Sequence, residues 1–276
     1  MAGPHSFGSA SLSARAEILA GRHIVVTRPA GQATHLAEAI AVLGGRPVLF
    51  PVLEIIDVPD YKPLLDIALR LDDFDLAVFI SPNAANKALD IILPRRPWPS
   101  SLRVATMGKS SEIELSRYGI KDIIAPQLRY ASEALRELPA MQAVAGKQIV
   151  IFRGDGGREL LGDTLVARGA TVTYVECYRR RKPQLDPAPL LKLWQNGELD
   201  AITVTSSEGL RNLFSMVGPL GDAWLRKTPL FVPHVRIAQQ AQNLGLSEVI
   251  TTGAGDDGLI AGLRAYFSEI SRHHGE

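Results

Sequence analysis

The sequence predicts an α/β protein built from doubly wound parallel sheets, and two observations lead to this prediction. Short apolar runs alternate along the chain with segments whose apolar residues follow a helical spacing. Such alternation is typical of right-handed βαβ crossovers, in which helices pack on a parallel sheet. The whole pattern then occurs a second time, with a proline-containing connector at the equivalent place. A chain of 276 residues is long enough for two domains of ordinary size.

Ten short apolar runs are the expected strands, five in each half of the chain. They lie at 24–27, 46–50, 76–81, 102–107 and 122–126 in the first copy, and at 149–152, 171–175, 201–206, 229–233 and 248–252 in the second. Runs of this kind suit parallel strands that are covered on both faces. The segments 34–45 and 158–170 have helical spacing and reach Gly44 and Gly169, where glycine can adopt the left-handed conformation that ends a helix.

One register relates the two copies. An offset of 125 residues aligns GRHIVVTRP, at 21–29, with GKQIVIFRG, at 146–154. The same offset pairs Leu36 with Leu161, Gly44 with Gly169, Asp75 with Asp200 and Ser81 with Ser206. After a slip of one residue, Trp98 pairs with Trp224 and Gly119 with Gly245. Coincidences at a nearly constant offset, inside matching strand and helix patterns, indicate an internal duplication.

The connectors at 53–63 and 178–189 occupy equivalent places in the two copies. They resemble a pair of crossings between domains, in which case each domain combines the opening of one copy with the remainder of the other. The sequence also permits a simpler arrangement, in which each copy folds as its own domain and the chain divides near residue 145. Residues 1–20 are rich in Gly, Ala and Ser and are expected to form a mobile extension rather than a secretory signal.

Composition excludes several classes of protein. With 30 Lys and Arg against 29 Asp and Glu, no global field would attract nucleic acid or an anionic membrane. The apolar runs end well before the roughly 20 residues that a membrane-spanning helix needs. A single cysteine, Cys177, excludes an internal disulfide, favours the cytoplasm and is expected to be buried and inert. The six histidines have no metal-binding spacing, so we expect no metal.

Polar residues follow the strands at the edge where ligands of parallel sheets gather, beyond the carboxyl ends of the strands. Small hydroxyls beside free backbone N–H groups suit carboxylate or phosphate oxygens, and an arginine could add a bidentate contact. We therefore expect these loops to line a shared crevice for an anionic ligand. Each hydroxyl or amide could equally be an ordinary helix cap. The candidates are Thr27, Arg28, Ser81, Asn83, Arg153, Gly154, Thr205, Ser206 and Ser207.

Three further features have both a functional and an ordinary interpretation. RGDGGR, at 153–158, looks like a phosphate loop but lacks the Lys-Ser/Thr ending of a nucleotide site. The basic run at 179–182 could attract an acidic substrate, although a solvated connector is the more usual reason for such a run. Tyr178 lies where a strand meets the connector, so its phenol could reach an interdomain cleft as a weak acid or could serve packing alone.

An ordered set of segments gives the chain a family resemblance. VVTRPAGQATHLAEAI, GGRPVLFPVLEI, FDLAVFISPNA, IFRGDGGRELL, RGATVTYVECYRR and LDAITVTSSEGL, in this order, resemble uroporphyrinogen-III synthase. The resemblance covers roughly residues 22 to 265, and it rests on the ordered set because no single string is diagnostic.

The resemblance implies two flavodoxin-like domains joined by a two-stranded connector. The expected domains are 21–54 with 178–276, and 55–177 inserted between them. It also implies the reaction, in which hydroxymethylbilane loses water and closes to uroporphyrinogen III with its last pyrrole ring inverted, without a cofactor. Conformational restriction would select the inverted product. Tyr178 matches the recurrent tyrosine of the family, which is the leading candidate to assist departure of hydroxide.

The sequence departs from the family in one loop. Residues 233–237 read PHVRI where many relatives have Gly and two Thr, so Arg236 is a candidate charged substitute for hydroxyl contacts. The equivalent loop at 107–111, MGKSS, is closer to the usual pattern and adds Ser110 to the candidates. The expected partner is the small-molecule substrate, and the expected state is a monomer.

Two other classes of protein would suit the same pattern. A non-catalytic bilobed receptor or regulator could close on a small anion with the same loop chemistry, and turnover would distinguish it from an enzyme. A nucleotide-sugar transferase with two Rossmann-like domains would instead need a diphosphate site, and nucleotide binding would favour it.

Overall fold

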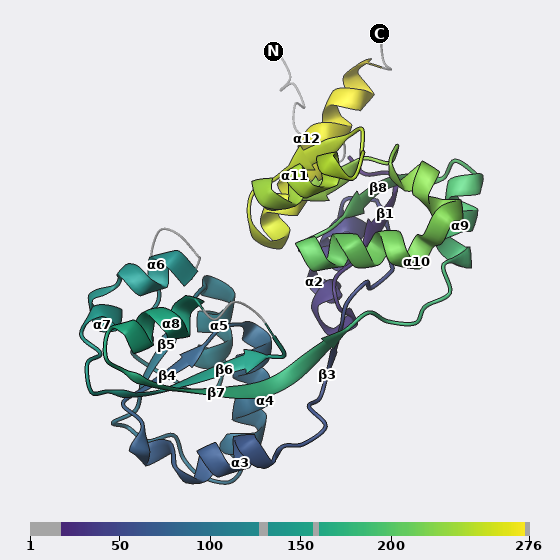
Figure 1. The fold of residues 1–276 in the computed structure, drawn as a ribbon. Coiled ribbons are helices and arrows are strands. Elements are labelled where there is room, and N and C mark those ends of the chain that lie inside the picture. The colour runs from purple at the N-terminus through teal and green to yellow at the C-terminus, as the bar shows by residue number, and fades with distance from the viewer. Residues whose placement is uncertain (1–17, 127–131, 157–159, 274–276) are drawn as a thin grey trace, which may run out of the picture. The chain divides into compact units, whose positions relative to one another are not determined.

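The computed structural model describes residues 18–126, 132–156 and 160–273 and divides the chain into two compact units (Figure 1). Among the described residues, one unit comprises those up to Glu54 and from Lys182 onward, and the other comprises those within Ile55–Arg181. Each unit contains one five-stranded sheet. The expected α/β class with parallel sheets is confirmed.

The sheet of the first unit has the strand order β10-β9-β8-β1-β2, and its neighbouring strands are parallel. The strands are β1 (His23–Val26), β2 (Arg46–Leu49), β8 (Leu199–Thr203), β9 (Leu230–Val232) and β10 (Val249–Thr251). From β1 the chain adds β2 on one side, and β8, β9 and β10 follow on the other. Strand order therefore reverses between β1 and β8, and ligands of open parallel sheets bind at the carboxyl ends of such strands.

Helices cover both faces of this sheet because successive strand residues point to opposite sides. Ile24 and Val26 pack with α2 (Ala30–Val42) and α12 (Gly255–His273), whereas Val25 packs on the other face. That second face is covered by α9 (Ala188–Gln195), α10 (Ser207–Leu225) and α11 (Val235–Asn243). The apolar runs of the sequence thus reflect strands that are buried on both sides.

The sheet of the second unit has the order β3-β7-β6-β4-β5. The strands are β3 (Glu54–Ile56), β4 (Leu76–Phe79), β5 (Arg103–Thr106), β6 (Gln148–Gly154) and β7 (Thr171–Arg181). The four strands from β7 to β5 are parallel neighbours. Here the chain continues from β6 to β7 on one side and from β4 to β5 on the other, so the order reverses between β6 and β4.

The second unit is also layered on both faces of its sheet (Figure 1). Ala77 and Phe79 of β4 face the helices α3 (Lys62–Leu69), α4 (Pro82–Ile92) and α5 (Lys109–Arg117). Leu76 and Val78 face the opposite layer. That layer contains α6 (Ser132–Glu137), α7 (Pro139–Gln142) and α8 (Leu160–Ala167). A 3-10 turn, η1 (Leu71–Asp73), follows α3.

Two expected elements differ from the structure. The strand expected at 122–126 is reduced to one parallel bridge between Ile124 and Ala105. Asp122 has a left-handed φ of 52°, which interrupts extended backbone, and Pro126 has no N–H to donate.

The strand expected at 171–175 instead continues to Arg181 as β7, because it pairs with β6 as far as Gly154 and has β3 as its other neighbour. The division between the units accordingly falls after Arg181 rather than after residue 177. By contrast, the predicted glycine ends of α2 and α8 are confirmed, since Gly44 and Gly169 have φ of 82° and 86°.

Candidate functional site

In the second unit, Tyr178 and Ser81 meet at the carboxyl edge of the sheet. Tyr178 lies on β7 opposite Gly154 of β6, and Ser81 follows β4. The Tyr178 hydroxyl lies 3.0 Å from Ser81 Oγ, within hydrogen-bonding distance. Only 6% of Tyr178 is exposed. The structure thus brings together two residues that the sequence pattern singles out independently.

Ser81 also begins the helix α4. Its Oγ accepts a hydrogen bond of 3.1 Å from the backbone N–H of Ala84, which satisfies one of the free donors at the helix start. Extended backbone at Ser81 and proline at the next position favour this helix start. Capping and contact with Tyr178 therefore use the same oxygen.

Gly154 provides the space that Tyr178 occupies. A Cβ atom at position 154 would lie 2.6 Å from Cζ of Tyr178 and 2.9 Å from its hydroxyl oxygen. The tyrosine ring thus extends from β7 across β6 toward β4. We expected Gly154 to contact substrate. In the structure it has a further role, because its missing side chain leaves the space that the Tyr178 ring occupies.

The backbone beside Tyr178 is held by the loop that follows β6. The Asp155 N–H donates to the carbonyl oxygen of Tyr178 at 3.0 Å. Arg180 donates in turn to Asp155, from its backbone N–H to Oδ1 at 2.9 Å and from Nη2 to the carbonyl oxygen at 3.0 Å. Arg180, from the basic run at 179–182, therefore helps to fix the strand that carries Tyr178. The rest of the RGDGGR loop, Gly157 and Arg158, lies outside the described residues.

Arg153 is placed differently from our expectation of a bidentate contact with a ligand. It is buried, its guanidinium lies 4.9 Å from the ring centroid of Tyr174, and its Nε donates to the carbonyl oxygen of Gly154 at 3.3 Å. The guanidinium thus packs on the ring of Tyr174, from the neighbouring strand β7. Asn83 and Ser110 lie instead in the first turns of α4 and α5, and Ser110 is exposed.

Cys177, next to Tyr178 in β7, is buried. Burial raises the pKa of its thiol to about 12, so the sulfur stays protonated near neutral pH. The expected burial of Cys177 is confirmed, and the raised pKa favours the expected inert thiol.

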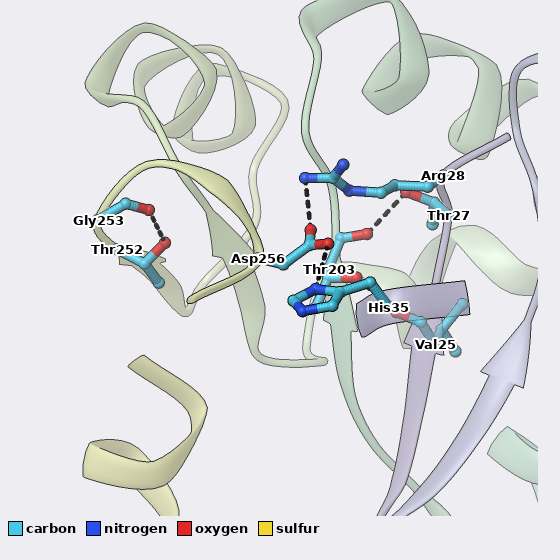
Figure 2. Close-up of polar contacts among 8 residues, drawn as sticks. All are labelled: Val25, Thr27, Arg28, His35, Thr203, Thr252, Gly253 and Asp256. Carbon is cyan, nitrogen blue, oxygen red and sulfur yellow. Dashed lines mark hydrogen bonds and ion pairs between the residues drawn. The ribbon is translucent and has the colours of Figure 1, made fainter. Parts of the chain in front are cut away.

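In the first unit, Thr27 and Thr203 join the two strands at which strand order reverses. Thr27 Oγ1 donates to the carbonyl oxygen of Thr203 at 2.7 Å, and Thr203 Oγ1 donates to that of Val25 at 3.0 Å (Figure 2). Both threonines are buried. We expected the Thr27 hydroxyl to face a ligand, but in the structure its proton stabilises the junction of β1 and β8.

Arg28 forms an ion pair that the sequence did not reveal. Its Nη2 lies 2.7 Å from Oδ1 of Asp256, and His35 Nδ1 lies 3.0 Å from Oδ2 of the same carboxylate (Figure 2). Asp256 stands in the first turn of α12, where a negative charge is favourable. In the sequence, the two acidic residues 256–257 after a glycine-rich turn indicate this helix start. They do not indicate which arginine would form an ion pair with Asp256.

Ser206 and His234 are both helix caps of the first unit. Ser206 Oγ accepts from the Gly209 N–H at 2.9 Å at the start of α10, and Thr205 and Ser207 beside it are half-buried. His234 Nδ1 accepts from the Arg236 N–H at 3.0 Å at the start of α11. A histidine therefore caps the helix after the loop that departs from the family pattern, while Arg236, the expected charged substitute for hydroxyl contacts, is exposed.

The described part of the chain contains no group of three His, Cys, Asp or Glu side chains arranged to hold a metal ion. None of the helices in that part combines the length and apolar character needed to cross a membrane.

Comparison with known proteins identifies the family. Residues 34–261 match the family model described as Uroporphyrinogen-III synthase HemD. The uroporphyrinogen-III synthase of Escherichia coli K12 is 34% identical over 244 residues, which cover 87% of this chain and 99% of that protein. The enzyme of Salmonella typhimurium LT2 gives the same identity and coverage.

Solved structures show the same fold at low sequence identity. Uroporphyrinogen III synthase from Thermus thermophilus, a mutant form, matches with a TM-score of 0.58 at 15% identity and covers 91% of this chain and 99% of its own. The synthetase from Helicobacter pylori 26695 matches with a TM-score of 0.54 at 12% identity, covering 87% and 97%. The chain therefore belongs to the uroporphyrinogen-III synthase family.

Proposed function

We propose that this protein is a lyase that closes linear hydroxymethylbilane to uroporphyrinogen III, with loss of water and inversion of the terminal ring, in tetrapyrrole (haem) biosynthesis. The family match and the identity of 34% over almost the whole length of two relatives support this activity. The structural observation that carries it is the Tyr178 phenol at the carboxyl edge of a doubly wound sheet, hydrogen-bonded to Ser81.

The chemistry requires one proton donor and firm control of geometry. Loss of the hydroxymethyl oxygen as water leaves an electrophilic methylene-pyrrole cation, which would close without inversion if it were free in solution. Closure through a spirocyclic intermediate, followed by fragmentation and a second closure, inverts the ring. Holding the chain in one conformation selects this route. Tyr178 would assist the first step by protonating the leaving oxygen.

The acetate and propionate groups of the substrate would bind at the carboxyl edges of both sheets. Helices α4, α5, α10 and α11 begin there, and their first N–H groups favour carboxylate oxygens. The residues that we assign to this role contribute backbone N–H groups as well as side chains. They are Thr27, Arg28, Thr205, Ser206, Ser207 and Arg236 in one unit, and Ser81, Asn83, Ser110, Arg153 and Gly154 in the other. The side chains of Thr27, Ser81 and Arg153 form contacts within the protein, so these three residues would contribute through their backbone.

We also infer that the units are two flavodoxin-like domains that arose by duplication and exchanged their openings, joined by a two-stranded connector. The strand order β2-β1-β8-β9-β10 agrees with the 2-1-3-4-5 order of flavodoxin-like sheets.

Two matching contacts support the exchange. Asp75 accepts from the Gln148 N–H at 2.9 Å and pairs with Lys147 at 2.7 Å, and Asp200 accepts from the His23 N–H at 2.9 Å and pairs with Arg22 at 2.6 Å. The offset of 125 residues relates these two sets of contacts. Each set joins an aspartate from one copy to the opening strand of the other.

Three further properties complete the proposal. The family resemblance supports action without a cofactor, and the single cysteine, buried as a thiol, supports a cytoplasmic location. We expect the protein to act as a monomer on its small-molecule substrate.

The activity is tested by supplying freshly generated hydroxymethylbilane and separating the isomeric products. We expect type III product, whereas type I product at the uncatalysed rate would contradict the proposal. Tight binding without turnover would instead indicate a non-catalytic receptor.

Tyr178→Phe tests the assigned proton donor. We expect turnover to fall about 100-fold, a typical effect of losing a general acid, with unchanged circular dichroism. Tyr118→Phe is the matched control. It also removes a phenolic hydrogen bond, which Tyr118 donates to Asp90 at 2.6 Å, but Tyr118 lies at the C-terminal end of α5, away from the helix start at the carboxyl edge of the sheet. Wild-type turnover in Tyr178→Phe would remove Tyr178 from the mechanism.

A further inference from the structure

The hydrogen bonds of Ser81 leave its proton available for Tyr178. A serine hydroxyl has one proton and two acceptor lone pairs. One lone pair accepts the Ala84 N–H at 3.1 Å, and the remaining partner of Ser81 Oγ is the Tyr178 oxygen at 3.0 Å. Ser81 can therefore donate its own proton to Tyr178 while it still caps α4.

We propose that Ser81 is a positioning residue that donates its hydroxyl proton to the Tyr178 oxygen and so directs the phenolic proton toward the substrate. This inference rests on the proposed function, in which Tyr178 is the proton donor. If Tyr178 donated to Ser81 instead, the phenolic proton would point at the helix cap and would be lost to the reaction.

The proposed step balances in protons and electrons. The bond between carbon and oxygen of the substrate hydroxymethyl group breaks, and its electron pair stays on the departing oxygen. The Tyr178 O–H bond breaks as that oxygen takes the proton, so the products are water, the methylene-pyrrole cation and a phenolate. The hydrogen bond that Ser81 already donates to the Tyr178 oxygen then stabilises the phenolate. The last closure of the macrocycle releases one proton, and this proton restores the phenol.

The helix start strengthens Ser81 as a donor. The N-terminus of α4, an 11-residue helix, carries a partial positive charge that favours a developing phenolate. A hydroxyl that accepts one hydrogen bond also becomes a stronger donor in the next. Ser81 is therefore better suited than an isolated serine to stabilise negative charge on Tyr178.

The position of the Tyr178 ring restricts which groups its hydroxyl can reach as hydrogen-bond partners. Its ring is buried over Gly154, and its backbone carbonyl is held by the Asp155 N–H at 3.0 Å. With the ring and the backbone both fixed, the one remaining freedom is rotation of the phenolic O–H bond. The Ser81 hydroxyl is the group that would set this rotation.

The other half of the chain provides an internal comparison. Ser206, related to Ser81 by the offset of 125 residues, caps α10 through the Gly209 N–H at 2.9 Å. The same offset places Leu53 where Tyr178 stands. Ser206 therefore has the capping role of Ser81, but a leucine stands at the position equivalent to Tyr178, and this separates the two roles.

The test measures kcat and KM of the full chain carrying Ser81→Ala, Ser81→Thr, Tyr178→Phe and the double change of Ser81→Ala with Tyr178→Phe. We expect Ser81→Ala to lower kcat about tenfold, as for the loss of one hydrogen bond to a charged group, with KM nearly unchanged. Ser81→Thr should recover most of this loss because it keeps the hydroxyl. The double variant should be no slower than Tyr178→Phe, since Ser81 acts through the phenol.

Loss of the helix cap is controlled separately. Ser206→Ala should lower the denaturation midpoint about as much as Ser81→Ala, because both lose an equivalent cap. If Ser81→Ala folds poorly, Ser81→Gly removes the hydroxyl but keeps a residue that is favourable at a helix start, and it should show the same loss of kcat.

The possible failures are distinguishable. Type I product from the wild-type protein would reject the proposed function, and a fully active Tyr178→Phe would reject the proton donor. If Tyr178→Phe is slow and the double variant is slower still by the whole factor seen for Ser81→Ala, then Tyr178 remains the proton donor but the positioning role of Ser81 is rejected. A Ser81→Ala variant that changes KM without changing kcat would also reject the positioning role.

Discussion

The ring of Tyr178 crosses the backbone of Gly154, where even a methyl group would collide with it. A Cβ atom at position 154 would approach Cζ to 2.6 Å, closer than real Cβ atoms come to a neighbouring carbon. The two residues lie opposite each other on paired strands, so neither backbone can move away without disturbing the ladder. The missing side chain at Gly154 is therefore a condition for the contact between Tyr178 and Ser81.

Gly154→Ala is expected to displace the Tyr178 ring and to lower turnover to about the level of Tyr178→Phe. Strain from the added methyl should also destabilise the fold by about 1–3 kcal/mol. Gly31→Ala is the control, since a Cβ there meets open space inside α2 and should be neutral or stabilising by up to about 1 kcal/mol. Turnover assays and urea unfolding check both variants, and a fully active Gly154→Ala would show that the ring has another path.

Asp256→Asn is expected to destabilise the first unit more than His35→Ala. Side chains of Arg28 and Asp256 are only 21% and 14% exposed, so removing the carboxylate leaves a mostly desolvated guanidinium without its counter-charge, at a cost of about 1–3 kcal/mol. The His35 side chain is 70% exposed, and its loss should cost less than about 1 kcal/mol. Equal denaturation midpoints for the two variants would contradict this ranking.

Sequence patterns predicted the elements of the fold better than their ends. Buried strands such as β4 are recognisable in the sequence as apolar runs. Gly44 marks the end of a helix because few other residues adopt its left-handed backbone conformation. The continuation of β7 through residues 176–181 was not predictable, because charged residues there resemble a solvated connector. In the structure, β7 pairs with β6 as far as Tyr178 and has β3 as its other neighbour. Tertiary pairing overrode the local pattern.

The candidate site shows the same limit. Sequence reasoning selected Ser81 and Tyr178 separately, but their contact spans 97 residues and depends on the order β7-β6-β4 and on the gap at Gly154. Thr27 was selected because a hydroxyl follows a strand, yet its proton is used by the Thr203 carbonyl. Composition shows which groups are present at a sheet edge, whereas packing decides which of them still face a ligand.

The Cys177 thiol is expected to resist modification in the folded protein. Burial raises its pKa to about 12, so at pH 8 almost none of it is thiolate, and the side chain is inaccessible. A chromogenic disulfide reagent should label no thiol in the native state and one thiol per chain in denaturant, because Cys177 is the single cysteine. Rapid labelling of the native protein would indicate that β7 opens readily.

Asp75 should contribute stability that disappears in acid. The hydrogen bond from Lys147 Nζ, and then that from the Gln148 N–H, lower the pKa of its carboxyl from the ordinary value. A lowered pKa means that the unfolded chain takes up the proton first as the pH falls. The contribution is therefore complete above the unfolded pKa, near 4, and is lost as the pH falls through the lower folded value.

Asp75→Asn is accordingly expected to be less stable than the wild-type protein at pH 7, by less than about 1 kcal/mol because the side chain is 39% exposed and screened by solvent. The difference between the two proteins should be constant from about pH 5 to 7 and should shrink on further acidification. Urea unfolding at several pH values checks this, with Asp73→Asn as the control in an exposed ion pair with Arg70. A difference that grows as the pH falls would mean that the carboxyl pKa is raised rather than lowered in the folded protein.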